Sequence, residues 1–210
     1  MTACEPHVVH QPRTSVIVPV YNKAPHLKAC FDCLECQTIS KSDLEVLLID
    51  DGSTDDSLAL CEAFAAERPW VRVIAQPNAG VSEARNAGIR AANGRYLFFL
   101  DPDDSLSPET LENVSMFFES CPDEIDLVTY PIVSIRDGKR QRLHHRYDVL
   151  RETGVYDLTL PENATVAQAT MNVAVRNCFD GNVLFDFAPA NGVIVHEDEK
   201  YCTDVLQGSM

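Results

Sequence analysis

The sequence predicts one α/β domain with a mostly parallel sheet flanked by helices. Short apolar and β-branched runs alternate in the first half of the chain with longer segments of helical periodicity, as in successive strand-helix units with right-handed crossovers. Polar residues follow these runs directly, where open α/β sheets place ligands. The 210 residues, 45% of them hydrophobic, suffice for one substantial core.

Four core strands are expected in the first half. Each run is short and rich in Val, Ile, Leu or Phe, which is typical of strands that are covered on both faces. Pro19 stands near the end of the first run, where the missing N–H group is tolerated. The predicted strands are residues 14–21, 44–50, 71–75 and 96–100.

Helices are expected between these strands. Apolar residues from Leu27 to Leu34 recur at helical spacing in the first. We expect Ser53 or Thr54 to cap the second helix at its N-terminus and Gly94 to cap the third at its C-terminus. The predicted helices are residues 24–37, 56–67 and 80–94.

Residues 95–105 carry the clearest signal of a functional site, because the fourth predicted strand ends there in three carboxylates. Asp101, Asp103 and Asp104 lie just beyond the apolar run. Like charges this close raise one another's pKa values unless they share a cation, so the pattern indicates a divalent ion. An acidic turn is the alternative, since Asp and Pro are ordinary turn residues.

Other polar residues close the strand-helix units at the same predicted edge. Gly52 permits a tight turn beside Asp50 and Asp51, which either face a ligand or cap the next helix. Arg85 lies inside the third helix, next to Asn86. Its permanent charge suits a pyrophosphate or a structural carboxylate, and a surface salt bridge is the alternative.

The second half has fewer signals. Pro108 opens a helix, and Glu197 and Asp198 begin a terminal helix, whose dipole favours negative charge. The basic segment 138–146 is compatible with an anionic acceptor or a membrane surface, but a solvated hairpin is favoured. The predicted elements are helix 107–121, strand 126–135, helix 160–175 and a short strand or bend at 183–187.

Composition narrows the classes of function. A formal net charge of −15 argues against nucleic acid as a partner. No apolar run approaches the ~18 residues of a membrane span, and residues 1–13 lack the apolar core of a secretory signal. We therefore expect a cytoplasmic location. Cys30, Cys33 and Cys36 fall at helical spacing without a second cluster, which favours packed thiols over a metal site.

Five motifs occurring in order resemble the family 2 glycosyltransferases of the GT-A fold, a Rossmann-like architecture. Any one of them is weak, but together they cover roughly residues 14 to 205. The motifs are Val-Pro-Val-Tyr-Asn at 18–22, Ile-Asp-Asp-Gly-Ser-Thr-Asp at 49–55, the segment 78–88, Leu-Asp-Pro-Asp-Asp at 100–104, and Glu-Asp-Glu-Lys-Tyr at 197–201.

The resemblance implies inverting transfer from a nucleotide diphosphate sugar, most simply a UDP-sugar, to a hydroxyl acceptor in glycan or cell-surface polysaccharide synthesis. Asp103, with Asp101, would bind Mn²⁺ or Mg²⁺, and Asp198 would be the general base, with Glu197 in reserve or orienting the acceptor. No Gln-x-x-Arg-Trp segment is present, which favours transfer of a single sugar. The residues expected at the nucleotide sugar are Pro19, Tyr21, Asn22, Asp50, Asp51, Gly52, Asn78, Gly80, Arg85 and Asp101.

The expected domain spans 14–206, between tails at 1–13 and 207–210. Its donor half is 14–105, and its acceptor half, expected to be a short C-terminal region, is 106–206. The acceptor is a glycan, a lipid-linked molecule or another hydroxyl compound, and peripheral association with the inner face of a membrane and an oligomer are both compatible with the sequence.

Three other interpretations remain open. One is a nucleotide-sugar-binding module without catalysis. The second is a haloacid dehalogenase phosphatase, although that family carries its Asp-x-Asp motif on the first core strand. The third is a sugar nucleotidyltransferase, which needs a basic Gly-rich loop where this chain has residues 21–25.

Overall fold

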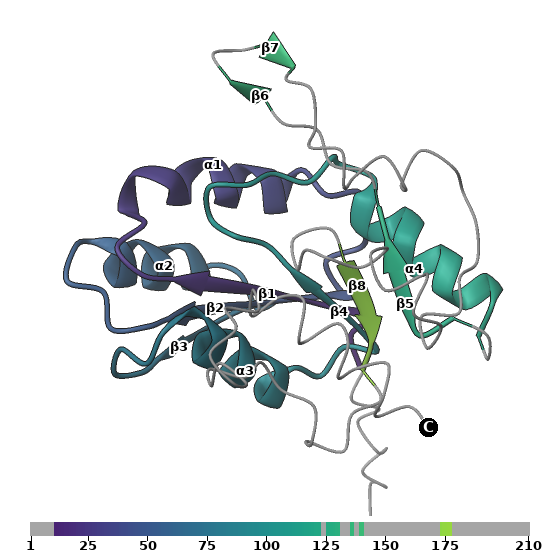
Figure 1. The fold of residues 1–210 in the computed structure, drawn as a ribbon, viewed down its shortest axis with the longest axis horizontal. Helices are drawn as coiled ribbons and strands as arrows, with labels where there is room; N and C mark the ends of the chain where they lie inside the picture. Colours follow the sequence, from purple (N-terminus) through teal and green to yellow (C-terminus); the bar gives the residue numbers. More distant parts are fainter. Residues whose placement is uncertain (1–10, 123–124, 131–134, 137–138, 141–172, 178–210) are drawn as a thin grey trace, which may run out of the picture.

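The computed structural model describes residues 11–122, 125–130, 135–136, 139–140 and 173–177, and it confirms the α/β architecture (Figure 1). Within these residues, six strands form one sheet in the order β3-β2-β1-β4-β8-β5. The first four are parallel, whereas β8 is antiparallel to both of its neighbours. The sheet is therefore mostly parallel, as predicted.

The elements follow the predicted order closely in the first half. The strands of the sheet are β1 (Thr14–Val20), β2 (Leu44–Asp50), β3 (Val71–Ala75), β4 (Tyr96–Phe99), β5 (Leu127–Thr129) and β8 (Val173–Arg176). The helices are α1 (Ala24–Glu35), α2 (Ser57–Ala65), α3 (Val81–Ala91) and α4 (Thr110–Ser120). A separate hairpin consists of β6 (Ile135–Arg136) and β7 (Lys139–Arg140).

Helices cover both faces of the sheet. Val16 and Val18 of β1 pack with buried residues of α1, α2 and α4, whereas Ile17 packs on the opposite face with residues of α3. A Cβ atom added to Gly88 of α3 would lie 2.3 Å from Ile17 Cγ2, so the glycine lets the helix approach the sheet closely. The central strands β1, β2 and β4 are buried on both faces because of this arrangement, which explains their continuous apolar runs.

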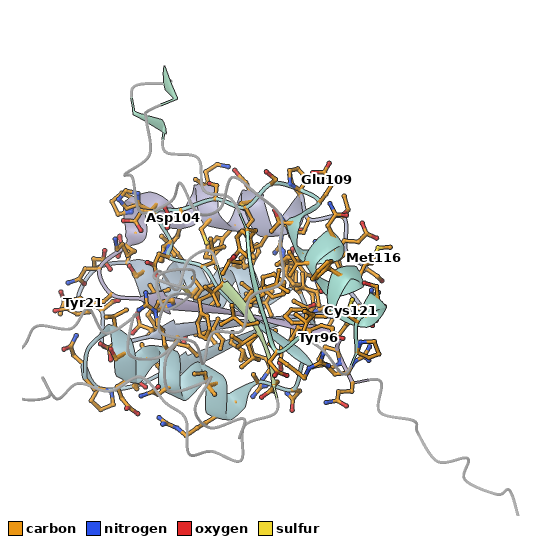
Figure 2. All side chains as sticks on the ribbon, turned by 45° about the vertical axis from the view of Figure 1, so that its right-hand side comes forward. Tyr21, Tyr96, Asp104, Glu109, Met116 and Cys121 are labelled. Carbon is orange, nitrogen blue, oxygen red and sulfur yellow. The ribbon has the colours of Figure 1, made fainter. Side chains whose placement is uncertain are left out.

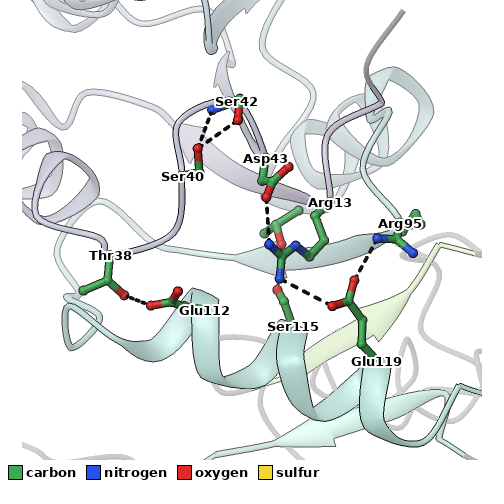
Figure 3. Close-up of polar contacts among 10 residues, drawn as sticks. Arg13, Thr38, Ser40, Ser42, Asp43, Arg95, Glu112, Ser115 and Glu119 are labelled. Carbon is green, nitrogen blue, oxygen red and sulfur yellow. Dashed lines mark hydrogen bonds and ion pairs between the residues drawn. The ribbon is translucent and has the colours of Figure 1, made fainter. Parts of the chain in front are cut away.

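Polar contacts join α4 to the ends of the strands opposite the predicted site (Figure 3). Arg13 donates to Asp43 at 2.7 Å and to Glu119 of α4 at 3.5 Å. Arg95 donates to the other oxygen of Glu119 at 2.8 Å. These bonds fix α4 against the amino ends of β1, β2 and β4.

The prediction of a helix over residues 160–175 is wrong for its last three residues. Val173, Ala174 and Val175 belong to β8 and are fully buried, with Val175 opposite both Leu97 and Leu127. Two β-branched residues favour this extended conformation between β4 and β5, and the strand pairing overrides the helical periodicity. The rest of that predicted helix lies outside the described residues, as do 183–187 and the predicted terminal helix.

Two predicted helix starts are also corrected. The N-cap residue of α2 is Asp56, so neither Ser53 nor Thr54 caps this helix. Helix α4 begins later than predicted, with Glu109 at its N-cap position and Pro108 before it. Helix boundaries depend on local hydrogen bonds that sequence patterns do not specify.

Gly94 does not cap α3, which ends at Ala91 with Ala92 as its C-cap residue. Instead, a Cβ atom at Gly94 would lie 2.5 Å from the backbone nitrogen of Ser15, so the glycine permits close packing against β1. The strand predicted over 126–135 is shorter: β5 ends at Thr129, and Ile135 pairs with Arg140 in the hairpin.

Candidate functional site

A pocket of about 440 Å³ lies at the carboxyl ends of β1, β2 and β4. Figure 2 shows Tyr21 and Asp104 at this end of the molecule and Met116 and Cys121 of the α4 region at the other. The lining residues are Pro19, Val20, Tyr21, Lys23, Asp51, Asn78, Gly80, Val81, Ala84, Asp101, Pro102 and Asp103. Most of the predicted donor-site residues are therefore brought together.

Four predicted site residues do not line the pocket. Asn22, Asp50, Gly52 and Arg85 lie beside it or behind it, as described below. Glu197 and Asp198 lie outside the described residues. The structure thus separates side chains that face the pocket from side chains that shape its wall.

Asp51 is buried and holds the loop before α3 in place. Its carboxylate accepts hydrogen bonds from the side chain of Gln76 at 2.7 Å and from the backbone nitrogens of Ala79 at 2.9 Å and Gly80 at 2.8 Å. The Asn78 side chain donates to the Asp51 backbone oxygen at 3.0 Å. Asp51 therefore positions the residues around it as well as facing the pocket.

A tight turn after β2 locks the loop that follows β1. Gly52 adopts a φ of 73°, and an added Cβ atom would lie 2.7 Å from the Asn78 backbone nitrogen. Asn22 has a φ of 51°, and its Oδ1 accepts a hydrogen bond from the backbone nitrogen of Thr54 at 2.8 Å. Both residues use the left-handed region that glycine and asparagine tolerate best.

Asp50 is buried and does not line the pocket. One carboxylate oxygen accepts a bond from the backbone nitrogen of Ser53 at 3.1 Å, and the other has no hydrogen-bond partner among the described residues. Burial, followed by the nearby charge of Asp50, raises the pKa of the Cys61 thiol to about 12. Asp50 thus supports the turn after β2 from behind.

Arg85 forms a buried ion pair behind the pocket. One of its terminal nitrogens lies 3.2 Å from Asp101 Oδ1. The side chain of Arg85 is 5% exposed and that of Asp101 25%. Of the alternatives for Arg85, this geometry matches the structural carboxylate, because the guanidinium reaches Asp101 and does not line the pocket.

Lys23 forms the second ion pair of the acidic loop, with its Nζ 2.6 Å from Asp103 Oδ2. The hydrogen bond from Lys23 lowers the pKa of Asp103. Burial, and then the charges of Asp101 and Asp103, raise the pKa of Asp104. The expected repulsion among three carboxylates is therefore present at Asp104, and basic side chains neutralise the other two.

Lys23 was missed in the sequence although it lines the pocket. The signal was present, because Lys23 directly follows the Tyr-Asn pair at the end of the first strand. Val81 was also missed and is 40% exposed at the start of α3, within the pocket lining. Apolar residues at a helix start do not by themselves indicate a ligand.

The donor atoms of the pocket suit a hard divalent cation. Among the described residues, no group of three or more His, Cys, Asp or Glu side chains is arranged to hold a metal. Asp101 and Asp103 both line the pocket, however, and Mg²⁺ is commonly bound through one or two carboxylates plus the phosphates of a substrate. The two residues therefore fit a site that a bound phosphate ligand completes.

Fold and pocket together define an α/β protein of the type that binds ligands at the carboxyl ends of parallel strands. The chain belongs to glycosyl transferase family 2, whose family model matches residues 15–185. This assignment excludes the haloacid dehalogenase interpretation. It also agrees with the GT-A fold inferred from the motifs.

Known proteins support this assignment. The minor teichoic acid biosynthesis protein GgaB of Bacillus subtilis (strain 168) is 43% identical over 119 residues, which are 56% of this chain and 13% of GgaB. The S. aureus TarS 1-349 structure in complex with UDP-GlcNAc superimposes with a TM-score of 0.75 at 23% identity, covering 93% of this chain and 54% of that one.

A third similar protein is the mannosyltransferase PcManGT from Pyrobaculum calidifontis in complex with GDP-Man and Mn²⁺. Its TM-score is 0.68 at 21% identity, covering 94% of this chain and 52% of that one. At such identities the likeness of the two structures shows the fold alone.

The matched segment spans a third or less of the length of the first curated relatives. In the described part of the chain, no helix is both long and apolar enough to cross a bilayer.

Proposed function

We propose that the pocket is the donor site of an inverting glycosyltransferase that moves one sugar from a UDP-sugar to a hydroxyl acceptor in glycan or cell-surface polysaccharide synthesis. The observation that carries this proposal is that Tyr21, Asp51, Asp101 and Asp103 all line one pocket. TarS was solved with UDP-GlcNAc, and GgaB is named for teichoic acid biosynthesis, which supports both the donor and the class of product.

The pocket offers distinct surfaces to the parts of a nucleotide. Tyr21 lines the pocket and is 48% exposed, so its ring is accessible for stacking on a planar base. Asp51 and the loop that it fixes, with Pro19, Asn78 and Gly80, form the wall next to it. Asn22, Asp50, Gly52 and Arg85 serve this site by positioning these groups.

Asp103, together with Asp101, is proposed to hold Mn²⁺ or Mg²⁺. When bound, such an ion stabilises the negative charge that develops on the departing diphosphate. Arg85 fixes Asp101 from behind, and the loop after β4 places both carboxylates in the lining of the same pocket. The chain thus contributes oriented oxygen ligands to a site that the phosphates complete.

The acceptor hydroxyl needs a base, because it is a weak nucleophile while it keeps its proton. We propose Asp198 for this role, with Glu197 orienting the acceptor or acting in reserve. The donor would bind to residues 14–105 and the acceptor to residues 106–206, as a glycan, a lipid-linked molecule or another hydroxyl compound. The test is Asp198→Asn, which is expected to abolish sugar transfer while UDP affinity stays within about threefold of wild type.

A thermal-shift series tests the donor site. UDP-, GDP- and dTDP-sugars are compared with and without Mn²⁺, and stabilisation by the UDP-sugar with Mn²⁺ is expected to be largest. Asp103→Asn is expected to remove the part of this thermal stabilisation that depends on Mn²⁺. Equal UDP affinity in Mn²⁺ and in excess EDTA would contradict the metal-assisted site, and binding without transfer or hydrolysis of the donor would favour a nucleotide-sugar-binding module.

A further inference from the structure

We propose that Lys23 is a tethered counter-ion, which neutralises Asp103 while the pocket holds no donor and moves to the donor's diphosphate when a divalent cation binds Asp103. The inference rests on the proposed donor site. It adds a residue to that site and makes the cation and the donor bind together, in preference to the cation alone.

The geometry of the ion pair supports an exchangeable contact. Lys23 Nζ and Asp103 Oδ2 are 2.6 Å apart, and both residues line the pocket. Their side chains are 34% and 45% exposed, so water can replace either partner. The neighbouring pair of Arg85 with Asp101 is far more buried, with Arg85 only 5% exposed. Of the two, the Lys23 pair is therefore the one that is suited to opening.

The backbone below Lys23 is fixed, which confines any movement to the side chain. The backbone nitrogen of Lys23 donates to Ser57 Oγ at 2.9 Å, and that of Ala24 donates to Asp55 Oδ2 at 3.2 Å. The backbone nitrogen of Asn22 donates to Ser53 Oγ at 3.0 Å. A flexible lysine stem on a rigid base can reach neighbouring positions in the pocket without any change in the fold.

The ammonium group of Lys23 and a divalent cation compete for the carboxylate of Asp103. An ammonium group in contact with Asp103 both occupies a carboxylate oxygen and repels an incoming M²⁺ ion. A diphosphate offers Lys23 another anionic partner in the same pocket, so the donor relieves this competition. Binding of the cation and of the nucleotide should consequently reinforce each other.

The test is Mn²⁺ binding to the full chain, measured by the electron paramagnetic resonance signal of free Mn²⁺, with and without UDP. Lys23→Met is expected to bind Mn²⁺ about tenfold more tightly than wild type without UDP and to lose most of the enhancement by UDP. Lys23→Arg keeps the charge and should bind Mn²⁺ as weakly as wild type without UDP.

Lys28→Met is the matched control. Lys28 pairs with Asp32 at the same 2.6 Å on α1, but the two side chains are 85% and 64% exposed and neither residue lines the pocket. Its Mn²⁺ affinity should equal that of wild type. If Lys23→Met also matches wild type while UDP still promotes Mn²⁺ binding, the counter-ion role is refuted and the donor site stands. If wild type binds neither UDP nor Mn²⁺, both proposals fail.

Discussion

At the scale of single residues, the site depends on how carboxylates are held. Asp51, Asp101 and Asp103 each have a positioning partner: the loop before α3, Arg85 and Lys23, respectively. Buried or half-buried charges such as those of Asp51 and Asp101 are tolerated only when they are paired in this way, whereas the pair of Asp103 with Lys23 is more exposed to water. The partners therefore determine which carboxylate oxygens remain available to a ligand.

Arg85→Met tests the buried partner. Removing the guanidinium leaves Asp101 half-buried without its cation, so we expect urea unfolding to show a loss of about 1–3 kcal/mol. Asp101→Asn in the same chain should recover part of this loss, because no charge is then stranded. Arg90→Met is the control on the same helix: its pair with Glu83 is exposed, and a change within about 0.5 kcal/mol is expected. If Arg85→Met and Arg90→Met lost the same unfolding free energy, the role of Arg85 as the partner of Asp101 would be contradicted.

At the scale of elements, a polar cluster joins the amino ends of the strands opposite the pocket. Glu45 of β2 is buried and accepts bonds from Ser15 Oγ at 2.6 Å, from the backbone nitrogen of Asn93 at 2.8 Å and from Arg72 at 2.8 Å. Burial raises the pKa of Glu45, but the bonds from Asn93, Ser15 and Arg72 together outweigh it and the net pKa is lowered.

This lowered pKa predicts a pH-dependent contribution to stability. A carboxyl group with a folded-state pKa below its unfolded value of about 4.3 stabilises the fold at pH values above that number. The contribution is lost as the pH falls through the folded-state pKa. Glu45→Gln should therefore lower the unfolding free energy by about 1–3 kcal/mol at pH 7 and less at pH 3. A loss that is the same at both pH values would refute the role of the charge.

The elements also show where sequence patterns are sufficient. Strands β1 to β4 are short apolar runs with turn residues at both ends, so their positions and their shared edge follow from local sequence. Strand β8 is different, because Val173–Arg176 is fixed by pairing with β4 and β5, far away in the chain. Periodicity within one segment cannot reveal such a partner.

Sequence patterns are only partly sufficient for the pocket as well. Strand ends predicted Tyr21, Asp51, Asp101 and Asp103 correctly as neighbours, because parallel strands bring their carboxyl ends to one edge. The direction of each side chain was less predictable. Asp50 and Asp51 are adjacent in sequence, but Asp50 is the last residue of β2, and only Asp51, just beyond it, lines the pocket.

At the scale of the whole molecule, charge is the dominant feature. With a formal net charge of −15, the folded chain repels itself, and salt should relieve this repulsion. Raising NaCl from about 20 to about 200 mM at pH 7 shortens the screening length from roughly 20 Å to under 10 Å, so we expect the melting temperature to rise by about 2–4 °C. Differential scanning calorimetry measures this shift.

Near the isoelectric point of about 4.6 the net charge vanishes, and the same salt step should have little effect on the melting temperature. A melting temperature that falls with salt at pH 7 would mean that attractive ion pairs, such as those of Arg13 and Arg85, outweigh the net repulsion.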